Sequence, residues 1–312
     1  MSGPVIIVAG PTASGKSALA LALAERFHGE IVNADSMQVY RELPVLTARP
    51  TPADEARVPH HLYGVLSVAE ASSAGAWLTM ALQAITAIRA RGNLPIVCGG
   101  TGLYLKVLTE GIAPVPEVPA VVTEEAKRLY DEEGGEAFQR RLALLDADAA
   151  GRLAAGDRQR LVRAYAVVRA TGRPLGSWQD AQPETPPLDA RFLKIVLIPE
   201  RAALYARIDA RFDAMLQMGA LEEVAALAGR GLDPDLPALK ALGVPEFRRH
   251  LDGACELAAA ADKAKQATRN FAKRQLTWYR HQLAADLQIE DFGGTEAIER
   301  AASKVQDFLA AG

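Results

Sequence analysis

Cysteine is almost missing from this sequence, which has only Cys98 and Cys255 among its 312 residues. Two cysteines that far apart exclude a disulfide framework, and they form no zinc-finger pattern with histidine. A chain that does not use cysteine for cross-links is typical of a reducing compartment, so we expect a cytoplasmic location.

Long apolar runs and a strong net charge are also missing. No apolar stretch approaches the roughly 18–20 residues that a membrane span requires, and the N-terminal residues lack the basic-then-apolar layout of a secretory signal, so no membrane partner is expected. The net charge of −3 gives no global attraction to nucleic acid, so any RNA contact must come from local patches. A composition of 49% hydrophobic and 23% charged residues excludes a wholly disordered chain.

Residues 10–17 read GPTASGKS and match the phosphate-loop pattern G-x-x-x-x-G-K-S. The glycines allow backbone N–H groups to surround an anionic oxygen, Lys16 supplies a positive charge, and the hydroxyl of Ser17 is a candidate ligand for Mg²⁺. A helix that starts at Ser17 adds the positive end of its dipole. The motif indicates a phosphate without identifying ATP. The candidate ligands of a diphosphate or nucleotide are Gly10, Pro11, Thr12, Ala13, Ser14, Gly15, Lys16 and Ser17.

Short apolar runs alternate with helix-forming stretches around this loop, as in 17–27. The alternation predicts an α/β fold, a P-loop-type parallel sheet flanked by helices. Beyond residue 201 the chain has a helical composition, apart from a turn-rich break at 229–237, and 258–285 is expected to form one long basic helix. The expected strands are 5–9, 30–34, 95–98 and 193–198.

Two proline-rich passages, 113–119 and 182–187, enclose a stretch of helical composition. We interpret them as stiff hinges that carry an inserted all-helical subdomain over 116–187. Residues 1–115 and 188–312 would then form the P-loop core domain with a helical C-terminal part. The alternative is that both passages are merely long surface loops.

Asp35 follows the second expected strand. In a doubly wound sheet the carboxyl ends of the strands face the ligand crevice, so Asp35 should point toward the phosphate loop, where its carboxylate could accept a proton from a nucleophile. The alternative is structural, because Asp35 with Gln38 three residues later also matches a helix capping box.

Five segments occur in a specific order along nearly the whole chain: GPTASGKS, NADSMQVYRELPVLTARP, CGGTGLYLKVLTEG, DRQRLVRAYAVVRATGRPL and KRQLTWYR. Together they resemble the tRNA dimethylallyltransferase family, also called tRNA isopentenylpyrophosphate transferases, in its compact bacterial form. The resemblance implies transfer of a dimethylallyl group from dimethylallyl diphosphate to N6 of adenosine-37, beside the anticodon of tRNA. It also implies that the phosphate loop holds the diphosphate of the prenyl donor rather than ATP.

This resemblance assigns catalytic roles. Asp35 would be the general base facing the adenine N6, and Lys16 and Ser17 with Mg²⁺ would stabilise the leaving diphosphate. Thr101 would contact the RNA near the target base, although it also fits the N-cap of a helix over 102–108. Arg211 would contact the diphosphate. Arg207, four residues earlier on the same helix face, would support it.

Two local segments are basic although the net charge of the whole chain is negative. Residues 152–173 hold six arginines and one acid, and residues 261–280 hold six lysines and arginines and one acid. Such runs are often only solvated faces, but the resemblance favours contacts with the anticodon stem-loop. The candidate tRNA-binding residues are Asp35, Ser36, Met37, Gln38, Thr101, Thr123, Gln159, Arg160, Leu161, Val162, Arg163, Lys273, Arg274 and Arg280.

The sequence departs from the family at 242–246, where it reads LGVPE instead of carrying Gly-Tyr followed by a basic residue, so no RNA contact is assigned there. His60 and His61 follow Pro59 in a turn-like setting, and we interpret them as structural or substrate-adjacent rather than as metal ligands. A small-molecule kinase that uses Asp35 as its base is the main alternative function. A third is an RNA-binding protein that uses ATP as a switch. A monomer is expected.

Overall fold

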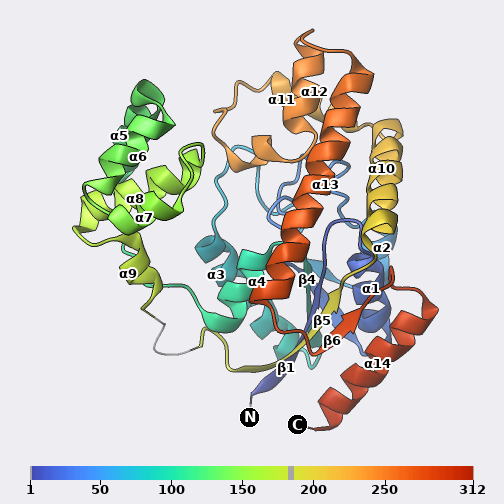
Figure 1. Ribbon diagram of the computed structural model, residues 1–312. Helices are drawn as coiled ribbons and strands as arrows, with labels where there is room; N and C mark the ends of the chain where they lie inside the picture. The colour runs from blue at the N-terminus through green and yellow to red at the C-terminus, as the bar shows by residue number, and fades with distance from the viewer. Residues whose placement is uncertain (1, 182–185, 312) are drawn as a thin grey trace. The chain divides into compact units, whose positions relative to one another are not determined.

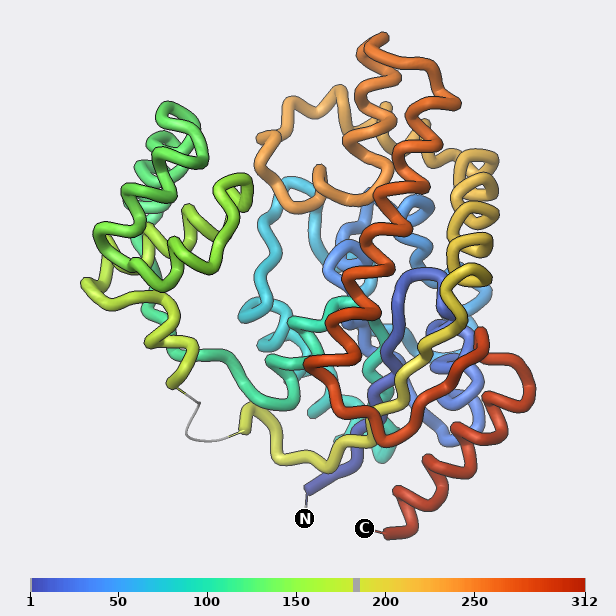
Figure 2. Tube along the Cα trace, in the orientation of Figure 1, coloured from blue at the N-terminus to red at the C-terminus, as the bar shows by residue number. Residues whose placement is uncertain are grey.

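The computed structural model describes residues 2–181 and 186–311, and the chain divides into two compact units. The first, here called the core unit, comprises Met1–Thr109 and Pro187–Gly312, and the second, the insertion unit, comprises Glu110–Pro186. Figure 1 and Figure 2 draw both with the same colour scale. Residues 182–185 of the second proline-rich passage lie outside the described residues.

In the part of the core unit that the structure describes, six strands form one parallel sheet in the order β3-β2-β4-β1-β5-β6. This confirms the predicted α/β fold with a parallel sheet. Ile7 in the central strand lies opposite Val97 on one side and Lys194 on the other. The strands are β1 (Gly3–Ala9), β2 (Gly29–Asn33), β3 (His60–His61), β4 (Leu94–Gly99), β5 (Ala190–Leu197) and β6 (Leu287–Ile289).

The two edge strands differ from the sequence prediction. His60 and His61 do not lie in a turn; they form β3 and pair with Ile31 and Val32. The region beyond residue 201 is not wholly helical, because β6 pairs with β5. Strands of two and three residues are too short to show an alternating pattern, so the tertiary pairing alone defines them.

Helices cover both faces of the sheet. Because successive side chains of a strand point to opposite faces, Val5 and Ile7 of β1 join the core beneath α3, whereas Ile6 and Val8 join the core beneath α1 and α14. Figure 1 shows α1 and α14 side by side. The helices of the core unit are α1 (Lys16–Arg26), α2 (Pro52–Arg57), α3 (Ala74–Ala90), α4 (Gly102–Glu110), α10 (Arg201–Gln217), α11 (Ala220–Ala228), the 3-10 helix η1 (Pro237–Lys240), α12 (Val244–Leu251), α13 (Leu257–Gln282) and α14 (Thr295–Ala310).

The long basic helix predicted over 258–285 is α13, which spans 26 residues and packs against α10 and α12. It is the orange-red helix at the centre of the core unit in Figure 2. One face of α13 is buried along its length, from Ala264 through Ala272 to Tyr279. Gln275 lies in this buried face with only 6% of its surface exposed.

The insertion unit has a hydrophobic core of its own, in which Phe138 and Leu161 are fully buried. No helix within residues 2–181 and 186–311 combines the length and the apolar character needed to cross a bilayer. Among its described residues the insertion unit is built from α5 (Ala120–Glu133), α6 (Gly135–Ala143), α7 (Ala147–Arg152), α8 (Arg158–Thr171) and α9 (Leu175–Gln179).

Candidate active site

Three loops meet at the carboxyl ends of the adjacent strands β1, β4 and β2. The phosphate loop follows β1, Gly100 and Thr101 follow β4, and Asp35 lies just beyond β2. The N–H of Thr101 donates to the carbonyl of Ala34 at 3.1 Å, so the ends of β2 and β4 are joined directly. The sheet therefore brings the predicted base, the predicted RNA contact and the phosphate loop to one edge.

The phosphate loop has the sharply curved backbone that its glycines predict. Ala13 and Gly15 have φ values of 65° and 92°, in the left-handed region, and the N–H of Ser14 donates to the carbonyl of Pro11 at 3.2 Å. A Cβ on residue 15 would overlap the backbone carbonyl of Phe292, so glycine is required there. Helix α1 begins at Lys16, so the first N–H groups of a helix, which lack partners within it, follow the loop directly.

Helix α13 supplies two supporting residues that the sequence analysis missed. Gln275 accepts a hydrogen bond from the N–H of Thr12 at 2.9 Å and donates to the carbonyl of Gly100 at 2.8 Å. The hydroxyl of Tyr279 donates to the carbonyl of Gly10 at 3.3 Å. The available signal was an amide inside the apolar face of KRQLTWYR, since a buried amide needs partners.

Opposite charges are concentrated in the site. Burial lowers the pKa of Lys16, and the charge of Asp35 opposes that change. Burial also lowers the pKa of Arg211 to about 10, with Asp35 again opposing. The guanidinium of Arg211 donates to the hydroxyl of Thr12, so α10 places a second cation against the phosphate loop. One turn earlier, Arg207 is exposed, and its guanidinium lies 4.8 Å from the ring centre of Phe292.

Asp35 lies in a tight turn rather than at a helix start. Its Oδ1 accepts the N–H of Met37 at 3.0 Å, and residues 36–39 form turns. The side-chain amide of Gln38 donates to the carbonyls of Thr47 and Ala48 at 2.8 and 2.9 Å. No helix follows Asp35 and Gln38 does not reach back to it, so the capping-box alternative is wrong.

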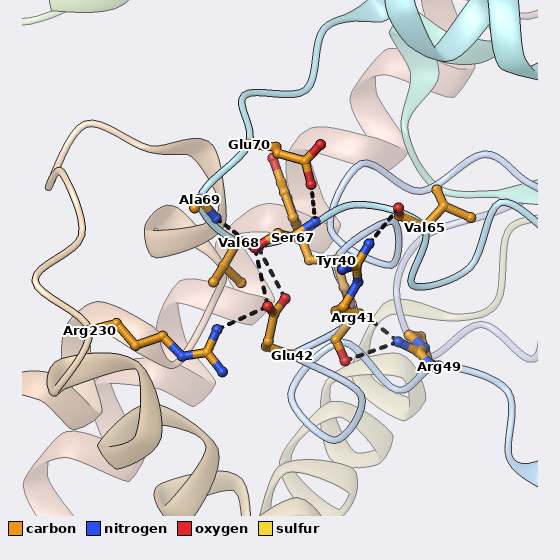
Figure 3. Close-up of polar contacts among 10 residues, drawn as sticks. All are labelled: Tyr40, Arg41, Glu42, Arg49, Val65, Ser67, Val68, Ala69, Glu70 and Arg230. Atoms are coloured by element: carbon orange, nitrogen blue, oxygen red, sulfur yellow. Dashed lines mark hydrogen bonds and ion pairs between the residues drawn. The ribbon is translucent and has the colours of Figure 1, made fainter.

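The segment after Asp35 is held in place by the half-buried carboxylate of Glu42. Figure 3 shows Glu42 accepting from the hydroxyl of Ser67 at 3.2 Å, the N–H of Val68 at 3.0 Å and the guanidinium of Arg230 at 2.9 Å. These contacts fix the chain at Glu42, four residues beyond Gln38; Ser36, Met37 and Gln38 are half-buried. The hydroxyl of Thr101 accepts the N–H of Ser36 at 2.9 Å, which ties this segment to the β4 loop.

Comparisons with known proteins identify the family. The model described as IPP transferase matches residues 38–282, and the one described as Isopentenyl transferase matches residues 3–63. The chain is 55% identical to the tRNA dimethylallyltransferase of Rhodospirillum centenum, over 95% of this chain and 94% of that protein. It is 52% identical to that of Rhodospirillum rubrum, over 99% and 94%. The chain belongs to the tRNA dimethylallyltransferase family.

Solved structures agree with this assignment. The full-length tRNA isopentenylpyrophosphate transferase of Bacillus halodurans is 31% identical with a TM-score of 0.70, covering 100% of this chain and 96% of that one. A eukaryotic dimethylallyltransferase described as acting on tRNA is 28% identical with a TM-score of 0.83, covering 99% and 80%. Both likenesses disfavour the small-molecule kinase alternative.

The tRNA dimethylallyltransferase resemblance assigned RNA contacts to α13. Lys273, Arg274 and Arg280 are exposed there, and Lys273 and Arg280 line a cavity of about 440 Å³. Two other basic residues of the segment are already paired, because Lys265 lies 2.6 Å from Asp213 and Arg269 lies 2.5 Å from Asp209. The exposed lysines and arginines of the helix are therefore Lys263 near its start and Lys273, Arg274 and Arg280 in its C-terminal half.

The insertion unit contains the remaining candidates. Gln159, Arg160 and Arg163 on α8 are exposed and line a cavity of about 590 Å³ within this unit, together with Arg152. The side chains of Leu161 and Val162 are buried in the core of the unit, whereas Thr123 on α5 is half-buried. Gln159, Arg160 and Arg163 thus share one surface, whereas Thr123 does not line this cavity.

Proposed function

We propose that this chain transfers a dimethylallyl group from dimethylallyl diphosphate to N6 of adenosine-37 in tRNA. The observation that carries the proposal is the carboxylate of Asp35 beside a phosphate loop where two desolvated cations meet, Lys16 of α1 and Arg211 of α10. A base and an anion cradle at one edge of the sheet are the two parts that such a transfer requires.

The diphosphate would supply the hydrogen-bond acceptors and the negative charge that the loop lacks. Ser14 is fully buried, and its hydroxyl has no hydrogen-bond partner among the residues that the structure describes. Burial disfavours the charged forms of Lys16 and Arg211, and a dianionic or trianionic ligand would reverse that effect. The fit of all three side chains to one anion supports this assignment of the loop.

The transfer breaks the allylic C–O bond of the donor and forms a bond between that carbon and N6. Negative charge develops on the departing diphosphate, where Lys16, Arg211 and the N–H groups at the start of α1 stabilise it. The proton that N6 loses passes to the carboxylate of Asp35. The target adenine must leave the base stack to reach this carboxylate, as in other enzymes that act on a base.

Mg²⁺ fits as a companion of the diphosphate. No cluster of three or more His, Cys, Asp or Glu side chains that could hold a metal occurs within the described residues, but Mg²⁺ commonly takes few protein ligands beside phosphate oxygens and water. The hydroxyl of Ser17, exposed in the first turn of α1, would hold it. When bound, Mg²⁺ neutralises part of the diphosphate charge.

One experiment separates the candidate functions. The protein is incubated with dimethylallyl diphosphate labelled in the prenyl group, or with γ-labelled ATP, each with and without unmodified tRNA. We expect label in tRNA only from the prenyl donor, and a control tRNA lacking adenosine at position 37 should stay unlabelled. Label transferred from ATP to any acceptor would overturn the proposal in favour of a kinase.

We propose further that the protein acts as a monomer in the cytoplasm. The site needs no second copy of the chain, because the phosphate loop, Asp35 and Arg211 all lie in one core unit. Light scattering of the purified protein should give a mass near 33.3 kDa. A mass of twice that value at micromolar concentration would contradict it.

A further inference from the structure

Asn33 is a fully buried polar residue at the end of β2, two positions before Asp35. Its Oδ1 accepts the N–H of Asp35 at 2.8 Å, and its Nδ2 donates to the carbonyl of the same residue at 3.0 Å. The same Nδ2 donates to the carbonyl of Leu62 at 3.0 Å. One side chain therefore holds both polar groups of the Asp35 backbone and joins them to the segment after β3.

The three N–H groups that start at Asp35 each donate to a side-chain oxygen. The N–H of Asp35 donates to Asn33, the N–H of Ser36 donates to Thr101 at 2.9 Å, and the N–H of Met37 donates to Asp35 itself at 3.0 Å. Backbone flexibility in such an irregular segment is removed only when its polar groups find partners. The last contact uses Oδ1 of Asp35, which sets the direction of the carboxylate and leaves Oδ2 beside Gly100.

We propose that Asn33 is a positioning residue for the prenyl transfer, because it fixes the backbone from which the Asp35 carboxylate faces the acceptor nitrogen. The inference rests on the proposed function and assigns Asn33 no contact with substrate. A misplacement of about 1 Å at a reacting group can cost about 100-fold in rate. Loss of the Asn33 contacts should therefore lower the rate of chemistry while the phosphate loop keeps its affinity for the donor.

The amide of asparagine meets all the hydrogen-bonding demands of this position. Its side chain must accept one hydrogen bond and donate two, and a carboxylate of the same shape offers no donor. The backbone of Asn33 is fixed independently, since its carbonyl accepts the indole N–H of Trp77 at 2.8 Å and Trp77 stacks on Tyr104 at 4.4 Å. A substitution at position 33 should therefore act on Asp35 more than on β2.

Asn93 offers a matched control. It is an asparagine at the opposite end of the same sheet, beside the first residue of β4, and its Nδ2 donates to the nearly buried carboxylate of Glu30 at 2.7 Å. Asn93→Ala removes a comparable amide from the same unit without touching the Asp35 segment. Any loss of general stability should appear in both variants.

The test compares Asn33→Ala, Asn33→Ser and Asn93→Ala with the wild-type protein. Single-turnover transfer from dimethylallyl diphosphate to unmodified tRNA is measured beside donor affinity by titration calorimetry, and hydrogen exchange is measured on the peptide that covers 34–40. We expect Asn33→Ala to react about 10- to 100-fold more slowly, with donor affinity within threefold of the wild type and faster exchange in that peptide. The hydroxyl of Asn33→Ser can still accept the N–H two residues later. The transfer rate of this variant should therefore lie between those of Asn33→Ala and the wild type.

The outcomes distinguish a failure of the proposed function from a failure of the positioning role of Asn33. If the wild-type protein transfers no prenyl group, the proposed function fails. If it does transfer and a folded Asn33→Ala protein reacts within threefold of the wild-type rate, Asn33 does not position the base. An equal loss of rate in Asn93→Ala would likewise overturn the inference, because it would reduce the effect to stability. If Asn33→Ala does not fold, Asn33→Ser takes its place in each comparison.

Discussion

Gln275 and Thr12 are 263 positions apart in sequence, yet the side chain of the first accepts the backbone N–H of the second at 2.9 Å. The same amide donates to the carbonyl of Gly100 at 2.8 Å, so one buried residue of α13 joins the phosphate loop to the loop after β4. This contact also occupies one of the N–H groups that a phosphate loop can offer an anion. The loop is thus shaped by a helix from the far end of the chain.

Gln275→Ala should impair the protein at this junction. The buried carbonyl of Gly100 and the partly buried N–H of Thr12 would lose their partner, which we expect to cost about 1–3 kcal/mol of stability and to raise the KM for the prenyl donor. Thermal melting and steady-state kinetics check both effects. Gln266→Ala, on an exposed position of the same helix, is the control and should change neither. A normal donor KM in Gln275→Ala would show that the loop keeps its shape unaided.

Asp35→Asn separates the chemistry of Asp35 from its structural contact. The amide oxygen can still accept the N–H of Met37, so the turn should persist, but the side chain can no longer take a proton. We expect single-turnover transfer to slow by about 100- to 10,000-fold, the range for a positioned general base. Donor and tRNA binding should change far less, because phosphate contacts carry most of both. Transfer at the wild-type rate would remove Asp35 from the mechanism.

The sequence predicted those parts of the site that depend on local spacing. GPTASGKS defines its own loop, and Asp35 follows a recognisable buried strand, so both could be placed at the sheet edge without coordinates. Gln275 could not be placed, because its partners lie far away in sequence. For the same reason the sequence predicted more basic residues available to RNA on α13 than the structure has, because Arg269 is paired with Asp209 of α10.

Lys16→Ala should weaken binding of the prenyl donor far more than binding of tRNA. Loss of a hydrogen bond to a charged group costs about 1.5–3 kcal/mol, so the donor KM should rise by about 10- to 100-fold while tRNA affinity changes little. Collapse of tRNA affinity with an unchanged donor KM would contradict the assignment of the loop.

The same lysine predicts a pH dependence. Burial holds the pKa of Lys16 below its usual value of 10.5, and the diphosphate binds the protonated form, so donor affinity should fall as pH rises through this lowered pKa. The fall should begin at a lower pH than an ordinary lysine would give, and in Lys16→Ala only the part due to Arg211, whose pKa is lowered to about 10, should remain. Calorimetric titration of the donor over the alkaline range provides the measurement.

The arginines of α8 predict a salt dependence for tRNA binding. Arg160 and Arg163 are exposed and line one cavity of the insertion unit, whereas Arg169, on the same helix, does not line it. Each phosphate contact releases counterions, so removing one should flatten the log–log dependence of affinity on salt by up to about one unit. Replacing Arg160 and Arg163 together with Ala should therefore weaken tRNA binding and reduce the slope by up to about two units. Prenyl-donor affinity should stay unchanged, because the donor ligands lie in the core unit.

Arg169→Ala provides the matched comparison, since it removes the same charge from the same helix and alters the total charge of the unit equally per site. Equilibrium binding to an anticodon stem-loop at several salt concentrations gives both slopes. If the charge of the unit acted only as a diffuse field, Arg169→Ala would weaken binding as much per charge as the other two. Contact with the RNA backbone requires a larger loss of affinity per charge for Arg160 and Arg163 than for Arg169. Equal losses would place the recognition of tRNA on another surface.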